Sequence, residues 1–396
     1  MPPLPSGYSL AGVFCGIKKK ADKLDITLIV SDRPATAAGV YTRNLVFAAP
    51  VALDRARTPG EGFRVVAINS GNANACTGDR GLRDAEEMAR LAAATCGAKG
   101  EQALVMSTGV IGNFLPMEKV AAGIAAAAAQ LGTSDSHLDS AGRGILTTDT
   151  GPKIAWRTLT LGGRKVQLTG LCKGAAMIGP NMATMLGLVF TDANVAATDL
   201  QKALTAAVDR SFNCISVDGH MSTNDTVLVL ANGAAGGSPL AGTDLAAFGK
   251  ALTEICAELA RMIPADGEGC THLVTLDITG CASADAARAI ARSVADSPLV
   301  KTAIAGGDPN WGRIVSAAGY AGIPFDPAKV GLKINGVELY RAGAPIPFDD
   351  PAVAKSMAEN REVHVELSFG EGSESIRFWT TDLTAEYVRL NADYRT

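Results

Sequence analysis

The stretch LCKGAAMIGPNMATMLGLVFTD, residues 171–192, decides how the rest of the chain is interpreted. The GPN triplet at 179–181 predicts a turn, because glycine and proline interrupt regular structure. The run that follows, residues 182–190, is nearly continuous and apolar, which indicates a strand buried on both faces. Thr184 places a hydroxyl where that strand begins, and Lys173 lies upstream of it. The stretch therefore combines a buried strand with a potential nucleophile at its start.

Cleavage of the Ala183–Thr184 peptide bond would turn Thr184 into a nucleophile that carries its own base. A threonine hydroxyl is weak until a base removes its proton. The freed α-amine has an ordinary pKa of about 7.7–8.0, which suits a general base near neutral pH. Before cleavage, the same hydroxyl could attack the Ala183 carbonyl, and hydrolysis of the resulting ester would release the amine. From this stretch alone, a plain turn followed by a core strand is the commoner interpretation.

Composition and charge exclude several classes of protein. The 396 residues are 47% hydrophobic, which is enough for a large core in one domain or in two to three ordinary ones. The net charge of −4, without a dense basic run, argues against a nucleic-acid-binding surface. The chain has no apolar run of about 18 residues, so we expect no membrane span. Residues 1–10 lack the pattern of a secretory signal, so we expect a cytoplasmic protein.

Familiar catalytic and cofactor motifs are missing from the sequence. HExxH and GxSxG are absent, which argues against a zinc protease and an α/β-hydrolase. The phosphate loop GxxxxGK[ST] and the dinucleotide fingerprint GxGxxG are absent as well. None of the eight cysteines forms a CxxC pair, so a thiolate metal site is not expected. We therefore expect a protein without a bound cofactor or metal.

Periodic patterns mix strands and helices along the whole length, which predicts an α+β fold. The strands are expected at 24–30, 63–69, 103–106, 227–231 and 273–278, and the helices at 82–92, 117–131, 245–262 and 283–294. Hairpins are expected at 153–169, 332–340 and 363–381. Residues 132–144 resemble a polar linker, and the polar end at 391–396 has a composition that is compatible with disorder.

A small polar sequence, STGVIG at 107–112, follows the strand expected at 103–106. A backbone N–H at Gly109 can point into a cavity without a side chain in its way. The Thr108 hydroxyl adds a second donor, and two such donors are what a developing oxyanion needs. Most Thr-Gly pairs are simple turns, so this sequence is open to both interpretations.

Taken together, eight collinear motifs resemble the ornithine acetyltransferase family over nearly the whole chain. They are NSGNANACTG (69–78), STGVIG (107–112), ILTTDT (145–150), CKGAAMIGPNMATML (172–186), STNDT (222–226), PADGEG (264–269), GGDPNWGR (306–313) and NADYRT (391–396). No single motif is specific, but their order along the chain is.

The resemblance implies cleavage at Ala183–Thr184, which would leave an α chain of residues 1–183 and a β chain of residues 184–396 in one intertwined catalytic unit. It implies a layered fold like that of N-terminal-nucleophile hydrolases. Thr184 would carry an acetyl group from N2-acetyl-L-ornithine to L-glutamate in arginine biosynthesis, which is glutamate N-acetyltransferase activity. Some family members also accept acetyl-CoA, and an α2β2 assembly is expected.

The resemblance also implies roles for individual residues. Thr108 and Gly109 match the oxyanion pair. The positions that match substrate contacts are Thr147, Lys173, Thr184, Glu268, Asn391 and Thr396. A cationic Lys173 suits a substrate carboxylate, and an anionic Glu268 suits an amino-acid amine.

Two loops, His220-Met221 and Cys270-Thr271-His272, depart from the pattern that is common in the family. These departures affect the expected fit of the substrate and leave the expected transfer chemistry unchanged. Two other functions compete with acetyl transfer. One is an N-terminal-nucleophile amidohydrolase or aminopeptidase, in which water takes the acyl group. The other is a binding protein that keeps the motifs but never cleaves itself.

Overall fold

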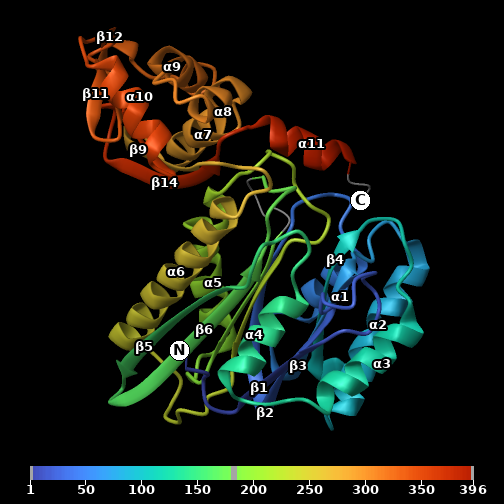
Figure 1. The fold of residues 1–396 in the computed structure, drawn as a ribbon. Helices are drawn as coiled ribbons and strands as arrows, with labels where there is room; N and C mark the ends of the chain where they lie inside the picture. Colours follow the sequence, from blue (N-terminus) through green and yellow to red (C-terminus); the bar gives the residue numbers. More distant parts are fainter. Residues whose placement is uncertain (1–2, 180–184, 394–396) are drawn as a thin grey trace.

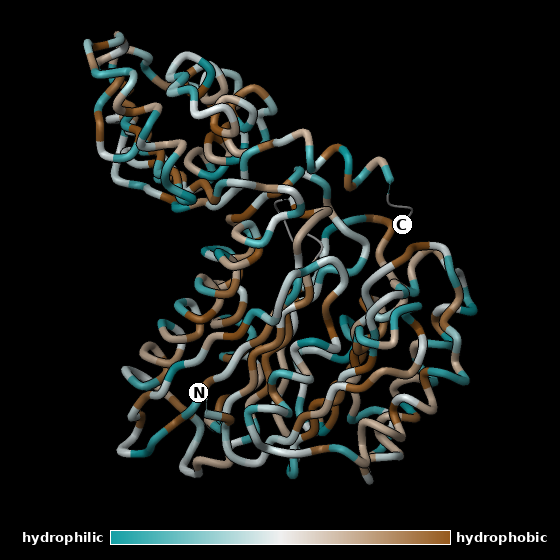
Figure 2. Tube along the Cα trace, viewed as in Figure 1, coloured by the Kyte–Doolittle hydropathy of each residue, from teal (hydrophilic) through white to brown (hydrophobic). Residues whose placement is uncertain are grey.

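The computed structural model describes residues 3–179 and 185–393, in which strands and helices form two layered units, each built on its own sheet (Figure 1). This arrangement confirms the α+β class. Apolar residues follow the strands at the centre of the larger unit, and hydrophilic residues mark many of the outer loops (Figure 2). No helix in the described ranges combines the length and hydropathy that crossing a membrane would require.

The sheet of the larger unit runs in the order β4-β3-β2-β8-β7-β6-β5, with β1 paired to β2. Its strands are β1 (Tyr8–Val13), β2 (Ile26–Tyr41), β3 (Gly60–Asn72), β4 (Ala103–Val110), β5 (Lys153–Leu161), β6 (Arg164–Lys173), β7 (Leu186–Thr191) and β8 (Thr226–Ala231). The strands β3 and β4 are parallel, as are β7 and β8, so the ends of β4 and β8 are fixed by neighbours distant in sequence. The hairpin of β5 and β6 is confirmed.

The strand β7 is buried along its whole length, as the apolar run predicts. Val189 enters the core beneath one helical layer, and Leu188 and Phe190 enter the core on the opposite face. Because β7 lies between β6 and β8, the larger sheet takes strands from both sides of the position 183/184.

Helices cover both faces of the larger sheet. They are α1 (Ala49–Arg57), α2 (Gly78–Thr95), α3 (Met117–Ala128), α4 (Asp135–Gly144), α5 (Ala197–Asp209) and α6 (Gly242–Ala265), with short 3-10 turns at Gly100–Gln102 and Phe212–Cys214. The helices α5 and α6 pack beside each other on the face that holds Val189 (Figure 1). The helix α4 contributes Leu138 and Ala141 to the core on the opposite face.

The smaller unit has a sheet in the order β12-β11-β10-β13-β9-β14. Its strands are β9 (Leu273–Cys281), β10 (Gly331–Ile334), β11 (Val337–Arg341), β12 (Ala344–Pro345), β13 (Glu362–Ser368) and β14 (Glu374–Thr381). Its helices are α7 (Ala284–Ala295), α8 (Pro298–Ala305), α9 (Trp311–Gly319) and α10 (Asp350–Glu359), with a 3-10 turn at Pro327–Lys329. These helices share one core with the strands.

The predicted linker at 132–144 is wrong, because α4 occupies most of it. Ser134 and His137 form a capping box at the start of this helix, with the His137 ring in the place of the usual Glu or Gln. Leu138 and Ala141 are then buried against the larger sheet, so a short apolar face stabilises a helix in a polar sequence.

The predicted hairpin at 363–381 is also wrong, although both of its strands exist. The strand β9 lies between them, parallel to β13 and antiparallel to β14. The two sequences therefore pair with a strand about a hundred residues earlier instead of with each other. The strand expected at 103–106 continues as β4 through Thr108 and Gly109 to Val110.

The described part of the chain ends in a helix, α11 (Ala385–Asp393), which includes Asn391. This helix leaves the smaller unit and lies over the end of the larger one (Figure 1). Residues 394–396 lie outside the described part of the chain.

Candidate active site

A small cavity of about 90 Å³ opens at the end of the larger sheet, beneath α11. Six of the predicted site residues line it, namely Thr108, Gly109, Thr147, Lys173, Glu268 and Asn391. The remaining lining residues are Ala73, Ile111, Thr148, Ala176, Met177, Ser222, Thr223 and Asn224. Seven separate parts of the sequence thus converge on one space.

Three predicted residues, Ala183, Thr184 and Thr396, lie outside the described residues, so their roles stay predictions. The structure does describe Met185, the residue that follows Thr184. Met185 is buried, and its amide donates a hydrogen bond to Asp225 Oδ1 at 3.1 Å. The residue after the predicted nucleophile is therefore held in place by a buried carboxyl group.

The predicted oxyanion pair lies at the end of β4, on the wall of the cavity. Gly109 has φ +135, a backbone conformation that favours glycine. A Cβ at this position would lie 2.3 Å from the carbonyl carbon of Gly71 on β3, so a side chain has no room. Asn224 Nδ2 donates to the carbonyl of Ser107 at 2.8 Å and to that of Ala73 at 2.6 Å. This amide joins the end of β4 to the loop after β3.

Lys173 ends β6 and is buried, with 2% of its surface exposed. Its Nζ donates to Thr108 Oγ1 at 3.3 Å, which places the amino group beside the predicted oxyanion pair. Burial lowers the pKa of Lys173, and the nearby carboxylate of Asp149 opposes this effect.

Behind Lys173 lies a buried network of charges that includes Asp149, Lys153 and Asp266. Lys153 Nζ lies 2.7 Å from Asp149 Oδ1 and 2.6 Å from Asp266 Oδ2. Burial alone would raise the pKa of Asp149, but Lys173, Lys153 and the Gly174 amide lower it to about 2. The Asp149 carboxylate is therefore ionised inside the protein.

Asp225 has the opposite character. It is fully buried, and burial raises its pKa well above the usual value. Its Oδ2 has no hydrogen-bond partner among residues 3–179 and 185–393. A polar atom buried without a partner is costly, and such groups gather at functional sites.

The helix α11 brings the end of the chain to the cavity. Asn391 Nδ2 donates to Glu268 Oε2 at 3.3 Å, and Tyr387 donates its hydroxyl hydrogen to Asp218 Oδ2 at 3.1 Å. Thr384 Oγ1 donates to the carbonyl of Gly269 at 2.6 Å. The polar end is ordered here because its side chains bond to the PADGEG loop.

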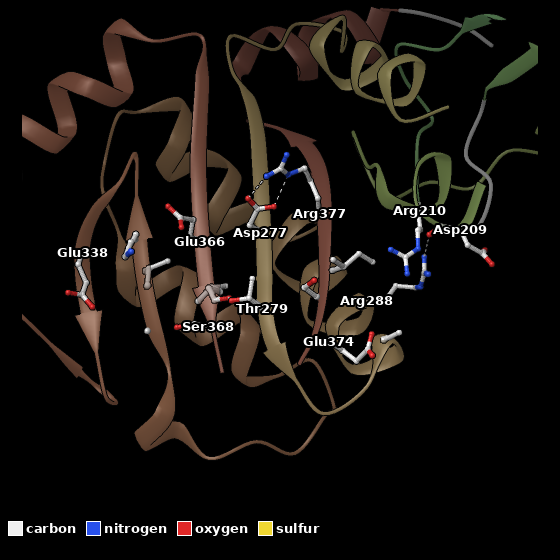
Figure 3. Close-up of a pocket in the computed structure, with 17 residues that line it drawn as sticks. Asp209, Arg210, Asp277, Thr279, Arg288, Glu338, Glu366, Ser368, Glu374 and Arg377 are labelled. Atoms are coloured by element: carbon white, nitrogen blue, oxygen red, sulfur yellow. Dashed lines mark hydrogen bonds and ion pairs between the residues drawn. The ribbon is translucent and has the colours of Figure 1, made fainter. Parts of the chain in front are cut away.

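A larger cavity, of about 650 Å³, lies on the smaller sheet and has a different composition (Figure 3). One ion pair of this cavity lies at the surface: Arg377 Nη2 lies 2.8 Å from Asp277 Oδ2, and Arg377 is half-exposed. Within the described ranges, none of the predicted site residues lines this cavity. We therefore place the active site at the small cavity.

Sequence reasoning missed three polar residues that build the site. Asp149 and Asn224 lie in motifs that support the family resemblance, ILTTDT and STNDT, but neither was given a role. Lys153 begins a strand and reads as a surface residue, yet only 4% of it is exposed. The departing loops at His220-Met221 and Cys270-Thr271-His272 do not line the described part of the cavity. The described residues contain no cluster of His, Cys, Asp and Glu suited to a metal ion.

Comparison with known proteins identifies relatives of the whole chain. A model of the ArgJ family matches residues 9–396. The chain is 48% identical over 396 residues to the arginine biosynthesis bifunctional protein ArgJ of Rhodopirellula baltica, and the alignment covers 99% of this chain and 96% of the relative. It is 49% identical over 395 residues to the protein of that name from Symbiobacterium thermophilum, covering 99% and 98%.

A crystal structure of arginine biosynthesis bifunctional protein argJ from Bacillus halodurans matches with a TM-score of 0.52 at 39% identity. The match covers 53% of this chain and 100% of that one. Just over half of this chain therefore shares its fold with a solved relative.

Proposed function

The chain belongs to the ArgJ family. We propose that it transfers an acetyl group from N2-acetyl-L-ornithine to L-glutamate, that Thr184 carries the acetyl group, and that the small cavity is the site of this reaction. The chain is an acetyltransferase of arginine biosynthesis. One observation supports the assignment of the site above all others. Every predicted site residue that the structure describes lines the same small cavity, although these residues are spread from position 108 to position 391.

In the proposed reaction, the chain first cleaves itself between Ala183 and Thr184. The new α-amine takes the proton of the Thr184 hydroxyl, and the oxygen attacks the acetyl carbonyl of N-acetylornithine. The tetrahedral intermediate collapses, its C–N bond breaks, and ornithine leaves with the proton on its amine. The amine of glutamate then attacks the acetyl-threonine ester, which yields N-acetylglutamate and restores the hydroxyl.

The described residues suit these steps. The Gly109 N–H and the Thr108 hydroxyl would hold the negative oxygen of each intermediate. Lys173 is proposed to bind a substrate carboxylate, and Glu268 a substrate amine. Thr147 and Asn391 line the same cavity and complete the substrate contacts, together with Thr396. The low exposure of Lys173 strengthens its attraction to a bound anion, since water does not screen it.

The two proposed fragments would stay together after cleavage. The strand β7 follows the cleavage point and pairs with β6 before it and with β8 after it. The solved relative from Bacillus halodurans is matched in full by just over half of this chain. Residues 184–396 also make up just over half of this chain. The length of the solved relative is therefore consistent with a fragment produced by cleavage between Ala183 and Thr184.

Three finer properties belong to the same proposal: acetyl-CoA as an alternative donor, an α2β2 assembly, and a place in the cytoplasm. Light scattering on the purified protein would test the assembly. The runner-up function, transfer of the acyl group to water, is not favoured by membership of this family.

A side-by-side assay tests the function. The purified protein is given N-acetylornithine with glutamate, and separately acetyl-CoA with glutamate. We expect ornithine and N-acetylglutamate in equal amounts in the first reaction. Release of acetate at a rate that glutamate does not change would contradict the proposal and favour a hydrolase.

A further inference from the structure

One buried carboxylate holds both walls of the small cavity. Asp149 Oδ2 accepts a hydrogen bond from the amide of Thr147 at 3.1 Å. Its Oδ1 accepts one from the amide of Gly174 at 2.6 Å, directly after Lys173. Since Thr147 and Lys173 both line the cavity, a single side chain fixes the backbone beside two of its polar residues.

The same carboxylate also connects the PADGEG loop to these walls. Lys153 bridges Asp149 to Asp266, with Nζ at 2.7 Å from one and 2.6 Å from the other. Asp266 in turn accepts from the Thr150 amide at 3.0 Å. Asp266 lies two residues before Glu268, so the network ends next to the third polar wall of the cavity.

Among the carboxylates that act on Lys173, Asp149 is the one whose charge raises its pKa most. The charged groups around Lys173 are Asp149, Lys153, Asp225, Glu268 and Lys18. Asp225 also favours the charged form of Lys173, but less than Asp149 does, and burial raises the pKa of Asp225 well above its usual value. Glu268 lies on the far wall, where Asn391 holds it. The two lysines oppose the charge of Lys173 and disfavour its protonation.

We propose that Asp149 is a positioning residue of the transfer site, which fixes the Thr147 and Lys173 walls and supplies the negative charge that keeps Lys173 an ammonium ion. The proposal rests on the proposed role of Lys173 in binding a substrate carboxylate. Asp149 does not itself line the cavity. It acts through Lys173, because an uncharged amine would bind a carboxylate much more weakly.

The pH profile of kcat/KM tests this role, because a purely structural residue would not move it. The acid limb should report the Thr184 α-amine, which must be unprotonated, and the alkaline limb should report Lys173, which must be protonated. In Asp149→Asn the pKa of Lys173 should fall, so the alkaline limb should move to lower pH by about one unit or more. The KM at pH 8 should rise about tenfold, while kcat changes less.

A second variant should move the same limb in the opposite direction. Lys153→Met removes a cation near Lys173, so the pKa of Lys173 should rise and the alkaline limb should move to higher pH. Both variants disturb one ion pair, so general damage would shift both profiles alike. Asp266→Asn is the matched control, because it removes a carboxylate bound to Lys153 and should move the limb less than Asp149→Asn.

Thermal melting and denaturing mass spectrometry establish first that each variant folds and processes itself. If Asp149→Asn does not fold, the upward shift in Lys153→Met decides the question. The wild-type enzyme gives a third check, since its alkaline limb should lie below the 10.5 of an ordinary lysine. Opposite shifts support the proposal, and an unmoved alkaline limb in a folded variant overturns it. A wild-type enzyme without transfer activity would instead defeat the proposed function.

Discussion

The two cavities of this protein differ in size and also in how far their charged side chains are buried. The cavity on the smaller sheet measures about 650 Å³, against about 90 Å³ for the one at the end of the larger sheet. In the large cavity Arg377 is half-exposed and pairs with Asp277 in contact with water. At the small one, Lys173 and Asp149 are almost fully buried.

This difference shows that the burial of charged side chains is a better guide to the active site than the volume of a cavity. An exposed ion pair contributes little free energy, because water screens both partners. A buried cation has lost its hydration and is strongly attracted to any anion that enters the cavity. The small cavity also adjoins Asp225, whose Oδ2 has no partner in the described residues. Such a place can bind and stabilise charge, whereas Arg377 at the large cavity already has an exposed partner in Asp277.

The largest effect is expected when the proposed nucleophile of the small cavity is removed. Thr184→Ala should leave the chain uncut and lower the rate of transfer at least about 10⁴-fold, because no hydroxyl remains to carry the acetyl group. Denaturing mass spectrometry and the transfer assay measure both effects. Thr184→Ser is the control and should keep some processing, since its hydroxyl survives. Cleavage that persists in the alanine variant would contradict the role given to Thr184.

A smaller effect is expected at the oxyanion pair. Thr108→Val keeps the shape of the side chain but removes its hydroxyl, so kcat should fall about 100–1,000-fold. The KM should change less, because the donor acts mainly on the intermediate. Steady-state kinetics on the processed enzyme measure the two constants separately. A kcat close to that of the wild type would show that Thr108 is not part of an oxyanion hole.

The buried network should also make stability depend on pH. The pKa of Asp149 is about 2 in the folded protein and about 3.8 in the unfolded chain. Its contribution is therefore complete above about pH 4 and is lost as the pH falls to about 2, and it amounts to about 2 kcal/mol. Denaturant unfolding across this range should show the difference between wild type and Asp149→Asn shrinking toward acid. A constant difference would mean that Asp149 is not ionised.

The smallest effect is expected at the large cavity. Arg377→Ala removes a half-exposed ion pair with Asp277 and should lower the free energy of unfolding by about 1 kcal/mol or less. Transfer activity should stay at the wild-type level, because the residue lies on the smaller sheet, away from the proposed chemistry. A tenfold loss of activity in this variant would abolish the distinction between the two cavities.

The sequence predicted local patterns well and long-range pairing poorly. The buried strand β7 and the hairpin of β5 and β6 follow from apolar runs and glycine turns within a few residues. The hairpin at 363–381 was wrong because β9, a strand remote in sequence, pairs with both of its members. No local pattern records such an insertion.

The same limit explains what was found and missed at the site. Thr108, Lys173 and Glu268 were predicted through motifs that resemble a family. Asp149 and Lys153 received no role, because their function depends on burial and on a mutual distance of 2.7 Å. Charge at the start of a strand ordinarily means exposure to water. The carboxylate that pairs with such a charge, and so permits its burial, can be identified only from the folded structure.

The most direct measurement is the mass of the enzyme's fragments after incubation with N-acetylornithine alone. We expect two fragments, of which the one that begins Thr-Met-Leu-Gly gains one acetyl group and loses it when glutamate is added. An active enzyme that remains a single chain of 40.6 kDa, or an acetyl group on a different residue, would contradict it.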